Sequence, residues 1–225
     1  MLLAGCFANY HHAELGPNDV VLALGDQFTS GGNVSETFRY TTVLGQNTNA
    51  RIVNLGRSGA MVADAIPVLR ENLAKHPNTR LVIVSLGYND IIKGVDPRFV
   101  TSAFVELFRE AQKAKVPVLL VGIPKLPYTK GNDKPTVLFE ELGTNNHIIY
   151  EREAFAAVLR EAENMESGNQ FNADGYRVFA EELGARLPFA CKPDNLREMC
   201  ATGEHRIYIT ETVEMTIAEF DDFTM

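Results

Sequence analysis

The sequence predicts a doubly wound α/β domain, in which parallel strands form one sheet and helices cover both of its faces. Four short apolar runs rich in β-branched residues are typical of buried parallel strands. Helical patterns lie between these runs, and the connecting turns are short. Because strand and helix signals alternate, we expect the functional site at the carboxyl ends of the strands.

The strands are predicted from uninterrupted apolar segments. The first begins at Val20 and ends before Gly25, without the alternation expected of a strand that faces water on one side. Each of the other three segments follows a helical pattern. The predicted strands are 20–24, 51–55, 81–86 and 116–122.

The helices are predicted from apolar residues that recur at helical spacing. Val62, Ile66 and Leu69 show this spacing in the second helix. A further helix is favoured after Asp96, which can cap its amino end, with Pro97 in the first turn. The predicted helices span roughly 34–44, 61–75, 97–115, 151–164 and 173–187.

Length and composition narrow the possible functions. The chain has 225 residues, of which 45% are apolar and 22% charged, as in an ordinary globular domain. Its longest apolar runs are too short to cross a bilayer. A net charge of −8 without a basic cluster argues against a nucleic-acid partner. No phosphate-binding glycine motif or metal-ligand cluster occurs, so neither a cofactor nor a metal is expected.

We divide the chain into an N-terminal arm (1–17), a main domain (18–187) and a C-terminal extension (188–225). The arm contains Leu-Ala-Gly-Cys ending at Cys6, which resembles the lipobox where bacterial lipoproteins are cleaved and acylated on cysteine. The few residues before Cys6 do not form a complete export signal. Two interpretations follow. The chain is a cell-envelope lipoprotein on the periplasmic side, held to the membrane only through lipid on Cys6, or it is cytoplasmic and the match is chance.

The extension carries the other two cysteines, Cys191 and Cys200. Export would allow these two to form a disulfide, whereas cytoplasmic residence would leave all three cysteines as reduced thiols. Residues 206–217 alternate apolar and polar side chains, which predicts a β-strand. This strand either adds to the domain's own sheet or forms a hairpin. Alternatively, it pairs with a partner or with a second copy of the chain.

Four polar, glycine-containing segments stand at the predicted strand ends and near the end of the domain. Each alone is typical of a tight turn. Together and in this order they resemble the four sequence blocks of the SGNH, or GDSL, hydrolase family over about residues 18–187. The resemblance implies a flavodoxin-like three-layer α/β/α fold and an activity among esterases, lipases, thioesterases and carbohydrate deacetylases. The segments are 25–32, 54–59, 87–90 and 167–176.

The resemblance also implies site residues. Family members carry a nucleophilic serine after Gly-Asp in the first block and Asp-x-x-His in the last; the corresponding positions here hold Gln27, Ser167 and Gln170. The implied oxyanion hole comprises the backbone N–H groups of Gln27 and Gly59 and the side-chain amide of Asn89. Asp26, before Gln27, is expected to stabilise the turn as a hydrogen-bond acceptor.

These substitutions close the usual acyl-enzyme route. A glutamine amide is not a nucleophile, and Gln170 cannot accept and return a proton near neutral pH. Thr29, Ser30 and Ser58 are the candidate substitute nucleophiles and His147 the candidate base, although each is more typical of a turn or loop residue. We therefore expect a degenerate active site, a pseudoenzyme that binds an acylated or carbohydrate ligand without efficient hydrolysis. The alternative is an ester hydrolase with an atypical nucleophile, or an inactivated variant of one.

Overall fold

The computed structural model describes Leu15 and residues 18–48, 50–125, 133–145, 148–166 and 170–187. Several sequence-based expectations lie outside these residues. They concern Cys6, His147, Ser167, Cys191, Cys200 and residues 206–217.

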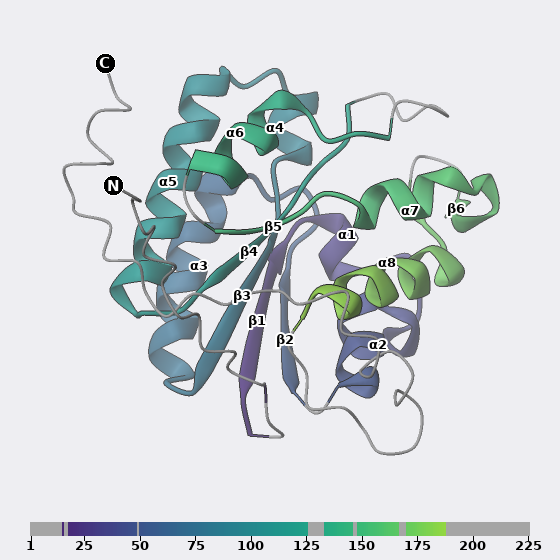
Figure 1. The fold of residues 1–225 in the computed structure, drawn as a ribbon, viewed down its shortest axis with the longest axis horizontal. Helices are drawn as coiled ribbons and strands as arrows, with labels where there is room; N and C mark the ends of the chain where they lie inside the picture. The colour runs from purple at the N-terminus through teal and green to yellow at the C-terminus, as the bar shows by residue number, and fades with distance from the viewer. Residues whose placement is uncertain are drawn as a thin grey trace, which may run out of the picture.

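A five-stranded parallel sheet forms the centre of the described part of the chain (Figure 1). Its strand order is β2-β1-β3-β4-β5, which is the order of flavodoxin-like sheets. The predicted fold class is therefore confirmed. The strands are β1 (Val20–Gly25), β2 (Arg51–Gly56), β3 (Thr79–Ser85), β4 (Val118–Val121) and β5 (Ile149–Glu151).

The position of β1 inside the sheet, between β2 and β3, explains why its sequence is apolar throughout. All six of its residues are buried. Val21 lies beside Ile52 of β2 on one side and beside Leu81 of β3 on the other. Because both faces of β1 are covered, side chains pointing either way must be apolar, and the run shows no polar alternation.

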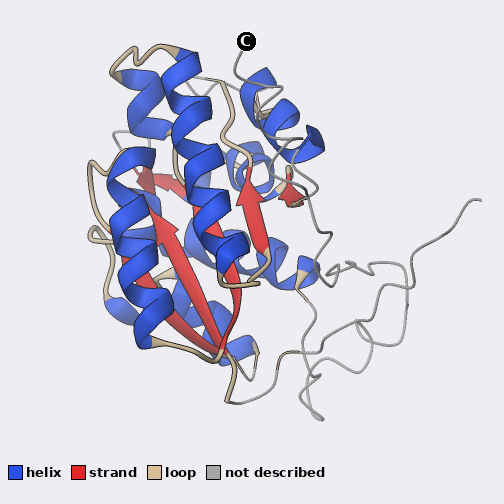
Figure 2. Ribbon diagram, turned by 90° about the vertical axis from the view of Figure 1, so that its left-hand side faces the viewer, coloured by secondary structure: helices blue, strands red, loops and turns tan. Residues whose placement is uncertain are grey.

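Helices cover both faces of the sheet (Figure 1). On one face, α3 (Val62–Lys75) packs against α5 (Pro97–Lys113). Figure 2 shows these helices in front of the strands. On the other face, α8 (Ala173–Arg186) packs against α2 (Tyr40–Asn47) and α7 (Ala154–Arg160). The rings of Tyr40 in α2 and Phe179 in α8 meet edge to face, with centroids 5.1 Å apart.

Side-chain caps fix the amino ends of the long helices α5 and α8. Asp96 Oδ1 accepts a hydrogen bond from the Arg98 N–H (2.9 Å), and Pro97 is the first residue of α5, as the sequence predicted. Asn172 Oδ1 caps α8 in the same way, accepting from the Gly175 N–H (3.0 Å). Among the described helices, none has both the length and the apolar character that a membrane span requires.

Two predicted helices differ from the structure. The helix predicted at 34–44 is wrong in extent, because extended backbone at Arg39 separates a 3-10 turn from α2. The helix predicted at 151–164 is also wrong, because Glu151 ends β5. The buried Glu151 carboxylate then accepts the Ala154 N–H (3.0 Å) and begins the shorter helix α7.

The short elements were not predicted individually, because two to nine residues carry too little periodic signal. Two of these, α1 and α4, follow β1 and β3 directly and carry site residues. The short elements are α1 (Gln27–Ser30), η1 (Glu36–Phe38), α4 (Tyr88–Ile92), α6 (Val137–Asn145), η2 (Ala162–Asn164), β6 (Met165–Glu166) and β7 (Gln170–Phe171).

Candidate functional site

The site lies at the carboxyl ends of the three neighbouring strands β2, β1 and β3. From β1, the chain passes first to β2 on one side of it and then to β3 on the other side. Ligands of open α/β sheets bind where the strand order reverses in this way. Gln27 opens α1 after β1, Gly59 lies in the turn after β2, and Asn89 lies in α4 after β3.

The turn after β1 is tightly packed and internally capped. Asp26 Oδ1 accepts a hydrogen bond from the Phe28 N–H (3.0 Å), which satisfies a donor at the start of α1. A Cβ atom on Gly25 would lie 1.9 Å from Thr29 Oγ1 and 2.9 Å from the Ser85 carbonyl oxygen. Only glycine fits at this position, because the end of β1 lies close both to Thr29 of α1 and to the end of β3.

The turn after β2 presents the Gly59 N–H. Its backbone is held at both ends, because the Arg57 N–H donates to the Gly25 carbonyl and the Ala60 N–H donates to the Arg57 carbonyl, each at 3.0 Å. Gly59 has a φ of 77°, in the left-handed region that favours glycine. The turn is thus anchored to the end of β1, beside Gln27.

Two donors converge on a single oxygen in this site. Asn89 Nδ2 donates to Gln27 Oε1 (3.0 Å), and the Gly59 N–H donates to the same oxygen (3.4 Å). The structure therefore brings Gln27, Gly59 and Asn89 together. Gln27 takes part through its side-chain carbonyl as an acceptor, whereas the family resemblance implies only a backbone donor at this residue. The sequence did contain a signal for this role. Gln27 stands where the family has its nucleophilic serine, and the longer glutamine side chain can reach the neighbouring loops.

Two buried carboxyl groups, those of Asp26 and Asp90, adjoin Gln27 and Asn89 in the sequence. Burial is the main cause that raises the pKa of Asp26 to about 7; the nearby Asp90 contributes to this rise, and the Phe28 N–H opposes it. Burial also raises the pKa of Asp90, whose Oδ2 accepts the Val62 N–H (3.2 Å). The side-chain oxygen Asp26 Oδ2 is buried and has no hydrogen-bond partner among the described residues. Asp26 therefore titrates near neutral pH, and its uncharged form is favoured below this pH.

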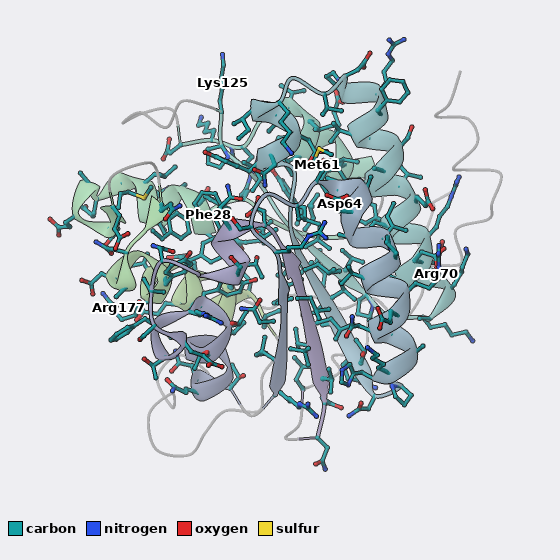
Figure 3. All side chains as sticks on the ribbon, turned by 180° about the vertical axis from the view of Figure 1, so that it is seen from behind. Phe28, Met61, Asp64, Arg70, Lys125 and Arg177 are labelled. Atoms are coloured by element: carbon teal, nitrogen blue, oxygen red, sulfur yellow. The ribbon has the colours of Figure 1, made fainter. Side chains whose placement is uncertain are left out.

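An aromatic cluster joins the segment of Gln170 to the rest of the site. The Phe28 ring contacts Tyr88 and Phe171, with centroids 5.2 Å and 4.9 Å away. These three rings are direct sequence neighbours of Gln27, Asn89 and Gln170. Figure 3 shows Phe28 and Met61, which flank the site loops, at the same end of the sheet. Packing of the rings thus places β7 next to α1 and α4.

The candidate substitute nucleophiles differ in their surroundings. Thr29 is fully buried and its Oγ1 lies 3.2 Å from Tyr40 Oη, so it cannot reach a ligand. Ser30 Oγ donates to the Gln27 backbone carbonyl (3.2 Å). Ser58 is exposed beside Gly59. His76 is the one described histidine; it follows α3 and precedes β3, at the opposite edge of the sheet from the site.

The described residues contain no group of histidine, cysteine, aspartate and glutamate side chains that could hold a metal ion. The arrangement around Gln27 can instead bind an acceptor oxygen, because its converging groups are N–H donors.

Comparison with known proteins shows which proteins are similar to this chain in sequence and fold. The sequence profile of the GDSL-like Lipase/Acylhydrolase family matches residues 23–178. The fold is similar to a crystal structure of TesA (18% identity, TM-score 0.63), covering 73% of this chain and 96% of that one. It is also similar to the psychrotrophic esterase EstA from Pseudoalteromonas sp. (17% identity, TM-score 0.64), covering 73% and 94%. AlinE4, an SGNH-hydrolase family esterase, shares 25% identity over 76% of this chain and 93% of its own, with a TM-score of 0.58. No curated protein matches the chain.

Proposed function

The chain belongs to the GDSL-like lipase/acylhydrolase family, and on this premise we propose that it binds an acyl-bearing ligand, such as an acylated carbohydrate, without efficient hydrolysis. Gly59 and Asn89 would supply the polar contacts to the acyl oxygen. The site would be a degenerate form of a hydrolase active site.

One observation carries this proposal: the Gly59 N–H and Asn89 Nδ2 both donate to the same carbonyl oxygen, that of Gln27. The carbonyl oxygen of an amide accepts hydrogen bonds in the same geometry as that of an ester. A donor pair that already holds one acyl oxygen therefore has the right spacing for the acyl oxygen of a ligand.

The residue types support binding over turnover. Gln27 and Gln170 provide neither a nucleophile nor a base, and Ser167 lacks the carboxylate that would orient a base. When triad residues are removed from serine hydrolases, an oxyanion hole and binding alone retain roughly a thousand- to ten-thousand-fold advantage over water. This remaining rate enhancement is far below that of a working enzyme.

A second candidate function, an ester hydrolase with an atypical nucleophile, is favoured by a specific observation. Ser58 is exposed and directly precedes Gly59, one of the two donors. A hydroxyl at this place could approach an acyl carbon whose oxygen is held by the donors. It would need a base to become reactive, however, and His76 lies at the other edge of the sheet.

Binding is tested with Asn89→Ala. This change removes one of the two donors, so a ligand oxygen would be left desolvated without a partner. We expect a loss of about 1–3 kcal/mol, or roughly five- to hundred-fold in affinity, for acetylated sugars and short acyl esters. Asn47→Ala, the same truncation at the exposed end of α2, serves as the matched control and should bind as the unaltered protein does. Equal affinities for the Asn89 and Asn47 variants would contradict the assigned donor.

Turnover is tested with p-nitrophenyl acetate. The triple variant Gln27→Ser, Ser167→Asp, Gln170→His restores the residue types that the family uses. It should hydrolyse this ester about 100-fold faster than the unaltered protein, or more, because a positioned base alone contributes that much. Efficient turnover by the unaltered protein, abolished by Ser58→Ala or Ser30→Ala, would establish the second candidate function instead.

A further inference from the structure

We propose that Gln27 is a built-in competitor for the ligand of this site: its side-chain amide occupies the Gly59 and Asn89 donors in the free protein, and an uncharged acyl group binds by displacing it. The inference rests on the proposed function, because it names how that same site is occupied and which ligands it admits.

The donors are fixed, whereas the acceptor is free to move. Asn89 is buried, and its Nδ2 also donates to the Ala60 carbonyl (2.9 Å), which fixes the orientation of the amide and directs its second N–H at Gln27. The Gly59 N–H is held by the anchored turn after β2. Gln27 reaches the two donors through a partly exposed side chain with three rotatable bonds. The movable member of the group is therefore Gln27.

The exchange of partners explains why Gln27 should weaken binding. With Gln27 in place, both donors already have an acyl-type acceptor, so a ligand replaces two hydrogen bonds with two others and gains little. Removing the amide leaves the donors to water, and a ligand oxygen then competes with water alone. We expect an affinity gain of about tenfold, equivalent to about 1.4 kcal/mol.

The charges around the site favour an uncharged ligand. The group that now fills it is a neutral carboxamide. Asp26 directly precedes Gln27 and Asp90 directly follows Asn89, and the two carboxyl groups are close enough to interact with each other. Arg57, the cation nearest in sequence to Gly59, is paired with Asp64 (3.2 Å). A carboxylate ligand would meet repulsion from Asp90, whereas an amide or ester oxygen would not.

Acetamide is the probe, because it reproduces the end of the Gln27 side chain. Gln27→Ala removes that end and leaves space for acetamide in its place. Titration followed by ¹⁵N NMR reports on the Gly59 amide and the Asn89 side-chain amide directly. We expect these two signals to move at about tenfold lower acetamide concentration in Gln27→Ala than in the unaltered protein, with acetate binding more weakly than acetamide.

Three further variants sharpen the test. Gln27→Met keeps the length of the side chain without the amide, and should also bind acetamide more tightly than the unaltered protein. Gln112→Ala truncates a glutamine in α5, away from the site, and should bind as the unaltered protein does. Adding Asn89→Ala to Gln27→Ala should remove the gain, because only one donor remains.

The outcomes separate the inference from the function on which it rests. Equal affinity of the unaltered protein and both Gln27 variants, with the Gly59 and Asn89 signals moving in all three, would overturn the competitor role and leave the binding function standing. If neither acetamide nor ethyl acetate moves these signals in any variant, the binding function fails as well. Tighter binding of acetate than of acetamide to Gln27→Ala would overturn the preference for an uncharged ligand.

Discussion

Single residues at the site have properties that depend on their neighbours. Asp26 keeps its side chain fully buried at the start of α1, with one oxygen bonded to the Phe28 N–H and the other without a partner among the described residues. Its pKa of about 7 lies far above the ordinary value of 3.8. Between these two values the folded protein holds a proton that the unfolded chain has already released. Folding stability must therefore fall as pH rises through this range.

Asp26→Asn should remove this part of the pH dependence. The amide stays neutral and can still accept from the Phe28 N–H, so the turn keeps its cap. From pH 5 to pH 8 the unaltered protein should lose about 3 kcal/mol of stability through Asp26, and the variant should not. Urea unfolding at both pH values measures the difference between the two proteins. Glu151, whose pKa burial also raises, remains in both proteins, and its contribution cancels in the comparison.

Glu36→Gln changes an exposed carboxyl and is the matched control. It should retain the full pH dependence of the unaltered protein. If the stability of Asp26→Asn falls with pH as steeply as that of the unaltered protein, Asp26 is ionised in the folded protein across this range.

At the scale of elements, the position of β7 depends on one side chain of another loop. Asn33 Nδ2 donates to the Phe171 carbonyl (2.7 Å), and Tyr176 Oη donates to Asn33 Oδ1 (3.2 Å). The Phe171 ring is also buried, in contact with Phe28 of the aromatic cluster. A two-residue strand has little stability alone, so these contacts hold Gln170 beside the site.

Asn33→Ala should loosen this segment without opening a cavity, because Asn33 is exposed. The Phe171 carbonyl loses its donor, and the cost should be about 1–3 kcal/mol. Hydrogen exchange should accelerate in the amides of β6 and β7 and remain unchanged in β1. Asn72→Ala removes an amide that donates within α3 to the Val68 carbonyl (2.9 Å), and should leave β6 and β7 unaffected. Unchanged exchange in the Asn33 variant would show that ring packing alone holds the strand.

On the scale of the whole molecule, one sheet organises the described chain. Its core draws residues from Leu15 to Leu187, which lie on both faces of the sheet and are buried together. The strand order separates β2 from β3 by the central β1, so the three loops that carry the site emerge side by side. The esterases EstA and AlinE4 have a similar fold. The fold therefore positions the loops, and the side chains on them decide between turnover and binding.

Much of this architecture is determined by the sequence alone. A strand buried on both faces must be apolar throughout, so the segments that became β1 and β3 could be recognised without a structure. The cap at Asp96 is equally local, because it depends on residues two apart. The family blocks placed Gly59 and Asn89 after the second and third strands. The three-residue strand β5 was not predicted, because so short a segment shows no recognisable hydrophobic periodicity.

Only the tertiary structure decided what Gln27 does. The sequence shows that glutamine replaces a nucleophile, but not that its oxygen lies 3.0 Å from Asn89 Nδ2, a residue 62 positions away. Likewise, the sequence places Asp26 in a turn, while its burial and its proximity to Asp90 raise its pKa. Strand and cap signals are local, since they arise within a few consecutive residues. Hydrogen bonds and charge interactions between loops depend on the spacing of β1, β2 and β3, which packing of the whole sheet and its helices sets.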